Sequence, residues 1–259
     1  MILKSKRLLD KIKLKIMKKF KGIELKFDEY LGFSKVRSNY GVWFQSNYRD
    51  STFRIYIMAS YGYFYWNRLS SIDKKFVFLD IGANQGLYSI CASLNPNVQK
   101  VYAFEPVPAT ASFLSRNLKL NGVEGKCVVH QKAVSNKVGV SEIEINDTHS
   151  GGATIAKRRI KGASQNHLEI ETIDASSLNN IIESEDYSIF VKIDVEGHEA
   201  VVIAELLKCE FAQKITEIFY EIDENWVNPS EIQAILEAAG FQTKKVVGGK
   251  KHYDMLAWR

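Results

Sequence analysis

The sequence predicts a doubly wound α/β fold with a mostly parallel sheet over residues 76–259 of the 259-residue chain. Short runs rich in β-branched residues alternate there with segments of helical periodicity. Parallel strands require crossover connections, which the helical segments provide. The composition, 46% hydrophobic, is sufficient for a core on both faces of such a sheet. The chain is therefore expected to form one main domain preceded by an accessory segment.

Residues 1–75 are predicted to form this accessory segment, a basic, aromatic-rich helical cap. They carry 17 Lys/Arg against 6 Asp/Glu, a net charge of +11, whereas residues 76–259 carry 18 against 24, a net of −6. Residues 1–21 hold nine basic side chains, and KIKLKI (11–16) alternates as a strand would. Four hydrophobic residues nevertheless recur there at near-helical spacing: Leu9, Ile12, Ile16 and Phe20. The pattern favours a basic amphipathic helix.

The basic helix has two explanations. In the commoner one, the helix packs on its own domain and its polar face is solvated. In the other, the polar face contacts an anionic membrane or an acidic partner. No hydrophobic run reaches the roughly 18 residues of a spanning helix, and lysines interrupt any signal-peptide core. We therefore expect a cytoplasmic protein, and a peripheral contact with an anionic membrane through residues 1–21 stays open as the second explanation. The widely spaced cysteines match no paired metal or redox motif and are expected to be reduced and buried.

Six runs are predicted as strands of the main domain: FVFLDI (76–81), KVYAFEP (100–106), CVVHQKAV (127–134), SIFVKIDV (188–195), ITEIFYEI (215–222) and MLAW (255–258). Four segments have helical periodicity: 87–95, 108–121, 198–209 and 229–239. Between them, residues 138–172 are predicted to form an extended insertion. The end of the chain is predicted to form a hairpin through GGKK. The aromatic run YGYFYW (61–66) is more typical of a core than of a sticky surface.

The turn after the first strand suits a nucleoside better than a diphosphate. It contains Asp80, Gly82, Asn84 and Gly86 at alternate positions. In an open parallel sheet, ligands bind beyond the carboxyl ends of the strands, where the strand order reverses. A dinucleotide fingerprint would place a glycine at the position of Asn84. The two glycines permit close backbone approach, while Asp80 and Asn84 offer polar groups to an ammonium and carboxylate end, directly or through water.

A carboxylate at the end of the second strand supports this interpretation. Glu105 follows Gly86 by 19 residues and could accept both hydrogens of a ribose diol. The turn alone is explained by a structural bend, and Glu105 alone by a surface acid. Their combination at two strand ends predicts a nucleoside site.

Four stretches resemble the FkbM-type family of S-adenosylmethionine-dependent methyltransferases: FLDIGANQGLYS, VYAFEPVPATASFLSRNLKLNG, HSGGAT and VKIDVEGHEAVVI. The resemblance covers about residues 76–259. It implies a seven-stranded, Rossmann-like methyltransferase sheet with S-adenosylmethionine as cofactor. The implied cofactor-binding residues are Asp80, Gly82, Asn84 and Gly86 at the methionine end, Glu105 and Pro106 at the ribose, Ala133 near the adenine, and Asp194.

The fourth stretch and the strand after it supply the predicted catalytic residues: Asp194, Glu196, His198 and Glu221. Methyl transfer depends mainly on positioning, and a hydroxyl acceptor also benefits from a base that takes its proton. Each residue has a structural alternative, since acids are favoured at a helix N-terminus and a histidine can be a hydrogen-bonded core residue. No metal is predicted, because no His or Cys spacing indicates one.

HSGGAT is predicted to be a lid, with His149, Ser150, Gly151 and Gly152 as substrate contacts. An ordinary tight turn is the alternative. The adjacent KRRIK (157–161) would suit an anionic acceptor, although solvated charge runs are commoner.

These features together predict an O-methyltransferase that acts on a sugar hydroxyl in surface polysaccharide or glycolipid biosynthesis. Acceptors differ among members of the family and include natural products, so a natural-product or RNA methyltransferase stays open. DVEGHE differs from the Asn-Pro-Pro-Tyr-like loop of many RNA methyltransferases, which disfavours a nucleic acid, and Asn84 disfavours a nicotinamide enzyme. A non-catalytic module that binds a partner through the aromatic N-terminal segment is the last alternative.

Overall fold

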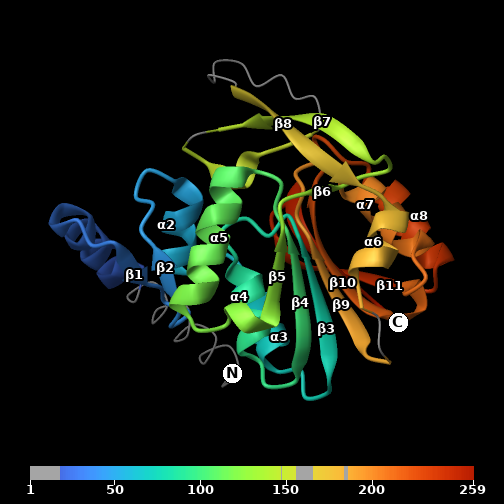
Figure 1. The fold of residues 1–259 in the computed structure, drawn as a ribbon, viewed down its shortest axis with the longest axis horizontal. Coiled ribbons are helices and arrows are strands. Elements are labelled where there is room, and N and C mark those ends of the chain that lie inside the picture. The colour runs from blue at the N-terminus through green and yellow to red at the C-terminus, as the bar shows by residue number, and fades with distance from the viewer. Residues whose placement is uncertain (1–17, 147, 156–165, 184–185) are drawn as a thin grey trace.

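The computed structural model describes residues 18–146, 148–155, 166–183 and 186–259. Within these residues, seven strands form a central sheet with helices on both faces (Figure 1). The sheet order is β11 (Gln242–Gly248), β12 (His252–Trp258), β10 (Ile215–Asp223), β9 (Ser188–Ile193), β3 (Phe76–Ile81), β4 (Val98–Phe104) and β5 (Cys127–His130). From β10 to β5 every pair is parallel, and β12 is antiparallel to both of its neighbours. The predicted doubly wound, mostly parallel sheet is confirmed.

The strand order reverses beside β3. This strand pairs with β4 on one side and with β9 on the other, so the chain first builds outward to β5 and then crosses back over β3. The predicted C-terminal hairpin is present as β11 and β12. The switch in strand order is where an open α/β sheet binds its ligand.

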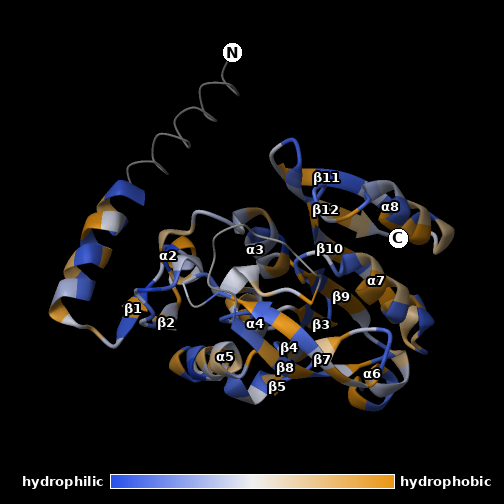
Figure 2. Ribbon diagram, turned by 90° about the horizontal axis from the view of Figure 1, so that it is seen from above, coloured by the Kyte–Doolittle hydropathy of each residue, from blue (hydrophilic) through white to orange (hydrophobic). Residues whose placement is uncertain are grey.

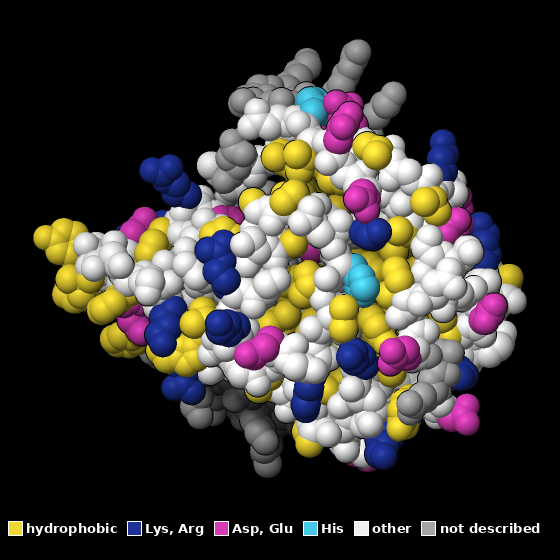
Figure 3. All heavy atoms as spheres, in the orientation of Figure 1, with side chains coloured by type: hydrophobic (Ala, Val, Ile, Leu, Met, Phe, Trp, Pro, Cys, Tyr) yellow, Lys and Arg dark blue, Asp and Glu magenta, His cyan; other side chains and the backbone are white. Residues whose placement is uncertain are grey.

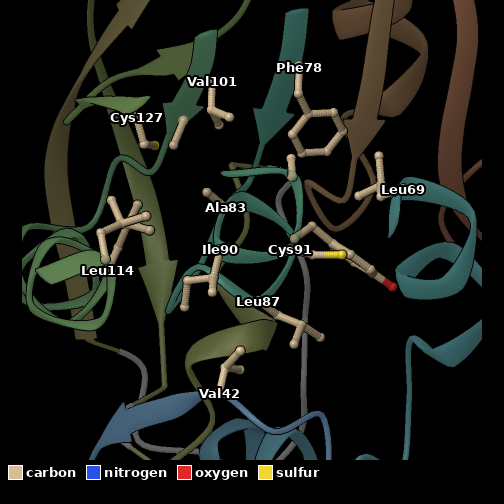
Figure 4. Close-up of a cluster of buried hydrophobic side chains, with 14 of the residues drawn as sticks. Val42, Leu69, Phe78, Ala83, Leu87, Ile90, Cys91, Val101, Leu114 and Cys127 are labelled. Carbon is tan, nitrogen blue, oxygen red and sulfur yellow. The ribbon is translucent and has the colours of Figure 1, made fainter. Parts of the chain in front are cut away.

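Residues of β3 alternate between two hydrophobic cores. Phe76 and Phe78 belong to one core, and Val77, Leu79 and Ile81 to the other. The first core (Figure 4) is covered by α2 (Ser51–Met58), α3 (Tyr63–Ser70), α4 (Leu87–Leu94) and α5 (Pro108–Leu120). The second is covered by α6 (Ala175–Ile181), α7 (Glu199–Lys208) and α8 (Pro229–Ala238). In the described part of the chain, three one-turn 3₁₀ helices connect other elements: Glu124–Lys126, Ser150–Gly152 and Ala212–Lys214.

The N-terminal segment is only partly helical. A helix over residues 18–31 is followed by an antiparallel pair, β1 (Lys35–Arg37) and β2 (Trp43–Gln45), which the sequence did not predict, and then by α2 and α3. Its buried side chains join the first core, and Tyr65 stacks on Phe219 of β10 with ring centroids 4.1 Å apart. Residues 1–17, with most of the predicted basic helix, lie outside the described residues.

The insertion forms a separate small sheet over the C-terminal ends of the central strands (Figure 1). It consists of β6 (Ala133–Val134), β8 (Asn166–Ile173) and β7 (Gly139–Ile145), with β7 antiparallel to β8. The segment KRRIK lies outside the described residues. Among the helices that the structure describes, none combines the length and hydrophobicity needed to cross a membrane.

Candidate active site

A cavity of about 420 Å³ lies at the carboxyl ends of β3, β4, β9 and β10. It therefore sits beside the switch in strand order, and its volume is within the range of small-molecule sites, about 300–1,000 Å³. The N-terminal segment, the insertion and β12 complete its walls. Residues far apart in the sequence thus line one cavity.

The glycine turn after β3 forms part of the wall. Gly82 lines the cavity with φ +74°, and a Cβ added there would lie 1.9 Å from the backbone oxygen of Asp194. Gly86 has φ +93° and packs against Leu114 instead, where a Cβ would lie 2.3 Å from Cδ1. Asn84 lines the cavity in a left-handed conformation. The two glycines are therefore needed for close packing, and Gly82 also shapes the cavity.

Glu105 follows the end of β4 and lines the cavity, with Pro106 beside it. Its Oε2 accepts a hydrogen bond from the backbone N–H of Asn84 at 2.9 Å, and its Oε1 accepts one from Val107 at 3.0 Å. Burial raises the pKa of the carboxyl to about 7 in spite of these bonds. An ionised carboxylate has about four acceptor positions, so Glu105 keeps acceptor capacity for a ligand.

Asp80 lies behind the cavity rather than in its wall. The residue is fully buried, and its Oδ2 accepts a hydrogen bond from Ser89 at 2.6 Å. Its Oδ1 lies 3.6 Å from Nζ of Lys192, which donates to the backbone oxygen of Gly82 at 2.6 Å. Burial lowers the pKa of Lys192, but the charges of Asp194 and Asp80 more than offset this and raise it. Asp80 thus supports the glycine turn through Lys192. The sequence had predicted that Asp80 contacts the cofactor, directly or through water.

Three carboxylates lie close together on the side of β3 opposite β4, at the ends of β9 and β10. One oxygen from each of Asp194, Glu196 and Glu221 lies within 4.8 Å of the others, and all three residues line the cavity. Glu196 lies beyond the end of β9 at Ile193 and adopts a left-handed conformation with φ +54°. The structure therefore brings together three of the four predicted catalytic residues.

His252 joins this group and was not predicted from the sequence. Its Nε2 lies 2.6 Å from Oε1 of Glu221, and this hydrogen bond raises the pKa of His252 to about 9. Burial and the charge of Asp194 raise the pKa of Glu221 to about 8. Asp254 shares the face of β12 with His252 and accepts a hydrogen bond from the Tyr61 hydroxyl at 3.1 Å.

His198, the fourth predicted catalytic residue, also lines the cavity. Its Nε2 lies 3.0 Å from Oγ of Ser135, and burial lowers its pKa, which favours the neutral ring. The neighbouring Glu199 accepts hydrogen bonds from the backbone N–H groups of Val195 and Gly197. Glu199 thus holds the turn that presents Glu196 and His198.

The loop HSGGAT is docked on the glycine turn and on the start of α2. Ser150 donates to Oδ1 of Asn84 at 3.1 Å, and Gln85 donates to Oδ2 of Asp50 at 2.8 Å. The other oxygen of Asp50 accepts the backbone N–H of Ser150 at 3.3 Å. Asp50, buried and absent from the sequence predictions, therefore joins the N-terminal segment, the turn and the loop.

Three of the four predicted substrate-contact residues line the cavity, and the fourth packs behind them. His149, Ser150 and Gly151 line the cavity, and Nδ1 of His149 lies 2.7 Å from Oγ of Ser51. Gly152 instead packs against the His149 ring, where a Cβ would lie 3.1 Å from Cδ2.

The two ends of the cavity differ chemically. Beyond Glu105, on the β4 side, its wall is mainly hydrophobic: Phe104, Pro106, Ala133, Val134, Ile143 and Ile155. On the β10 side the wall contains the carboxylates and His252, together with Tyr61, Val247 and Tyr253. The predicted residue Ala133 therefore lies among these hydrophobic residues of the β4 side of the wall.

Comparison with known proteins identifies the family. The methyltransferase FkbM domain matches residues 80–243, which is more than half of the chain. The hexuronic acid methyltransferase AglP of Haloferax volcanii is 26% identical over 181 residues, 68% of this chain and 67% of that protein. Methyltransferase 1 of Beauveria bassiana is 26% identical over 185 residues, 65% of this chain and 73% of that protein.

Solved structures with a similar arrangement are more distant in sequence. Methyltransferase FkbM from Methylobacillus flagellatus KT has 15% identity and a TM-score of 0.46, over 72% of this chain and 43% of that one. TrmK of M. capricolum, solved with S-adenosylhomocysteine, has 12% identity and a TM-score of 0.46, over 76% and 68%. The extent of the domain match decides the assignment: the chain belongs to the FkbM methyltransferase family and is an S-adenosylmethionine-dependent methyltransferase.

Proposed function

We propose that this enzyme methylates a hydroxyl of a sugar during the synthesis of a surface polysaccharide or glycolipid. The observation that carries the proposal is the chemical contrast within one cavity, between the hydrophobic end beside Glu105 and the carboxylate cluster around Glu221. A polyhydroxylated acceptor suits the second end, because ionised carboxylates only accept hydrogen bonds and sugar hydroxyls donate them. The similarity to a hexuronic acid methyltransferase supports the same class of acceptor.

The first end fits the cofactor. Glu105 keeps acceptor positions for the two ribose hydroxyls, and the hydrophobic wall beyond it, which includes Ala133, suits the adenine. Gly82 and Asn84, between Glu105 and the acids, would hold the amino-acid end. When bound, S-adenosylmethionine supplies a methyl group on a positively charged sulfur.

Cofactor affinity should depend on the ionisation of Glu105. Ribose hydroxyls donate to the ionised form, and the pKa of this carboxyl is about 7. The affinity for S-adenosylhomocysteine should therefore be roughly tenfold weaker at pH 6 than at pH 8. Glu105→Gln should weaken binding at the higher pH by about 1 to 3 kcal/mol and flatten this dependence. Isothermal titration calorimetry measures both, and an unchanged dissociation constant in the variant would exclude the ribose assignment.

At the second end, Glu221 has the position and ionisation of a general base. A methyl acceptor must be held in line with the transferred group, and Asp194 and Glu196 can do this by accepting hydrogen bonds from its other hydroxyls. Burial and the charge of Asp194 raise the pKa of Glu221, so its ionised form is a stronger base for the proton of the reacting hydroxyl than an exposed carboxylate would be. His252 holds Glu221 through their 2.6 Å hydrogen bond. The four side chains thus bind, orient and deprotonate one acceptor.

A methyl-transfer screen tests the class of acceptor. The purified enzyme and S-adenosylmethionine are incubated with nucleotide sugars, short glycans containing uronic acids, RNA and phenolic natural products, and products are detected by the mass of one added methyl group. We expect methylation of one or more glycans, and its loss in the Glu221→Gln variant. Methylation of RNA alone, with salt-dependent RNA binding, would replace the proposal with an RNA methyltransferase. Binding of S-adenosylhomocysteine without transfer to any glycan would also contradict it.

A further inference from the structure

The helix over residues 18–31 exposes a hydrophobic face. Phe20, Ile23, Phe27 and Tyr30 are 69%, 60%, 62% and 85% exposed. Their spacing of three and four residues places them along one side of the helix. Figure 2 shows hydrophobic positions along this helix, and Figure 3 shows hydrophobic side chains gathered on the projection that it forms at the left of the molecule. We call these four residues the exposed face.

The exposed face is not the result of an undocked helix. On its other side, Leu25 is 3% exposed and belongs to the first core. Gly22 packs against Met58 of α2, where a Cβ would lie 3.6 Å from the thioether sulfur. Arg54 of α2 donates to both carboxylate oxygens of Glu29, at 3.0 and 3.1 Å. These contacts fix the helix so that the exposed face points outward.

The charge of the adjacent sequence indicates which partner covers this face. Residues 1–21 contain nine Lys/Arg and a single acid, Asp10. The sequence also continues the hydrophobic spacing towards the N-terminus with Leu9, Ile12 and Ile16. Aromatic and aliphatic side chains on one side of a helix, next to many lysines, are typical of helices that lie in the interface of an anionic bilayer.

We propose that the exposed face inserts into the headgroup region of an anionic lipid bilayer, with the lysines of residues 1–21 attracted to the lipid charge. The inference does not depend on the identity of the methyl acceptor. Helix α2 lies between this face and the cavity, since Arg54 and Met58 contact the helix while Thr52 and Tyr56 line the cavity. Membrane binding would therefore hold the active site about one helix diameter, roughly 10 Å, from the bound helix.

Co-sedimentation with lipid vesicles tests the proposal. The full chain is mixed with vesicles of phosphatidylcholine alone or with added phosphatidylglycerol, at low and high salt. We expect binding to the anionic vesicles, weakened by salt and by removal of the charged lipid. The variant F20S/I23S/F27S should bind at least about tenfold more weakly. The variant V138S/V140S/W226S, which removes three exposed hydrophobic residues outside the helix, should bind like the unaltered chain.

Other outcomes would overturn the inference. These are failure to bind anionic vesicles, equal binding to neutral and anionic vesicles, or unaltered binding by F20S/I23S/F27S. A dimer in sedimentation velocity that this variant abolishes, without any lipid binding, would assign the face to a second copy of the chain. Binding of S-adenosylhomocysteine serves as the folding check for both variants, so loss of lipid binding with retained cofactor binding is specific to the surface.

Discussion

Gly82→Ala is expected to abolish measurable binding of S-adenosylhomocysteine and to lower the free energy of unfolding by about 3 kcal/mol. The added Cβ would lie 1.9 Å from the backbone oxygen of Asp194, so either the glycine turn or the end of β9 must move. Both line the cavity, and Lys192 also holds the backbone oxygen of Gly82. Calorimetric titration and chemical denaturation measure the two effects.

Gly122→Ala is the matched control for this substitution. Gly122 has φ +67°, close to the +74° of Gly82, but a Cβ there would meet no atom within 4 Å. The control should therefore show only the cost of a left-handed alanine, about 1 kcal/mol, with normal cofactor binding. If both variants lost the same stability and both bound the cofactor, the close packing of Gly82 against Asp194 would have no functional consequence.

Glu221→Gln is expected to lower kcat by about 10²- to 10⁴-fold while cofactor affinity stays within about twofold. A base accepts a proton only when it is ionised, so the kcat of the unaltered enzyme should rise as the pH rises through the raised pKa of Glu221. The variant should lose this rise. Initial rates at saturating cofactor and acceptor across the pH range provide both tests.

Glu224→Gln is the control for charge removal near the same strand end. Glu224 is exposed and accepts a hydrogen bond from the Tyr253 hydroxyl at 2.9 Å, and it is not among the described residues that line the cavity. Its kcat and pH dependence should match those of the unaltered enzyme. A Glu221→Gln enzyme with nearly normal kcat would move the base to Asp194, Glu196 or His198.

The central sheet was predictable because its signals are local. Each strand run and connecting helix shows its own periodicity, and the structure places the four predicted helices within one residue at either end. Helix α6 was missed, although Asp174 is a standard N-cap that accepts the backbone N–H of Ser177 at 3.0 Å. The β1–β2 pair was missed because strands of three residues are too short to show a period.

The site was predictable where its residues follow strand ends in sequence, as Gly82, Glu105 and Asp194 do. His252 and Asp50 were not, because each reaches the site through pairing between segments far apart in the chain. The hairpin prediction could have placed His252 and Asp254 on one face of the last strand, but not beside Glu221, since that depends on the register of β12 against β10. Asp80 shows the converse limit, because a residue near a strand end can be buried behind the cavity instead of lining it.

A crystal structure of the enzyme with S-adenosylhomocysteine would locate each part of the cofactor in the cavity. Both ribose hydroxyls are expected to donate to the Glu105 carboxylate, the adenine to lie beside Ala133, and the sulfur to face the cluster of Asp194, Glu196 and Glu221. A nucleoside bound with its ribose away from Glu105, or in the separate pocket lined by Arg68 and Glu217, would contradict this placement.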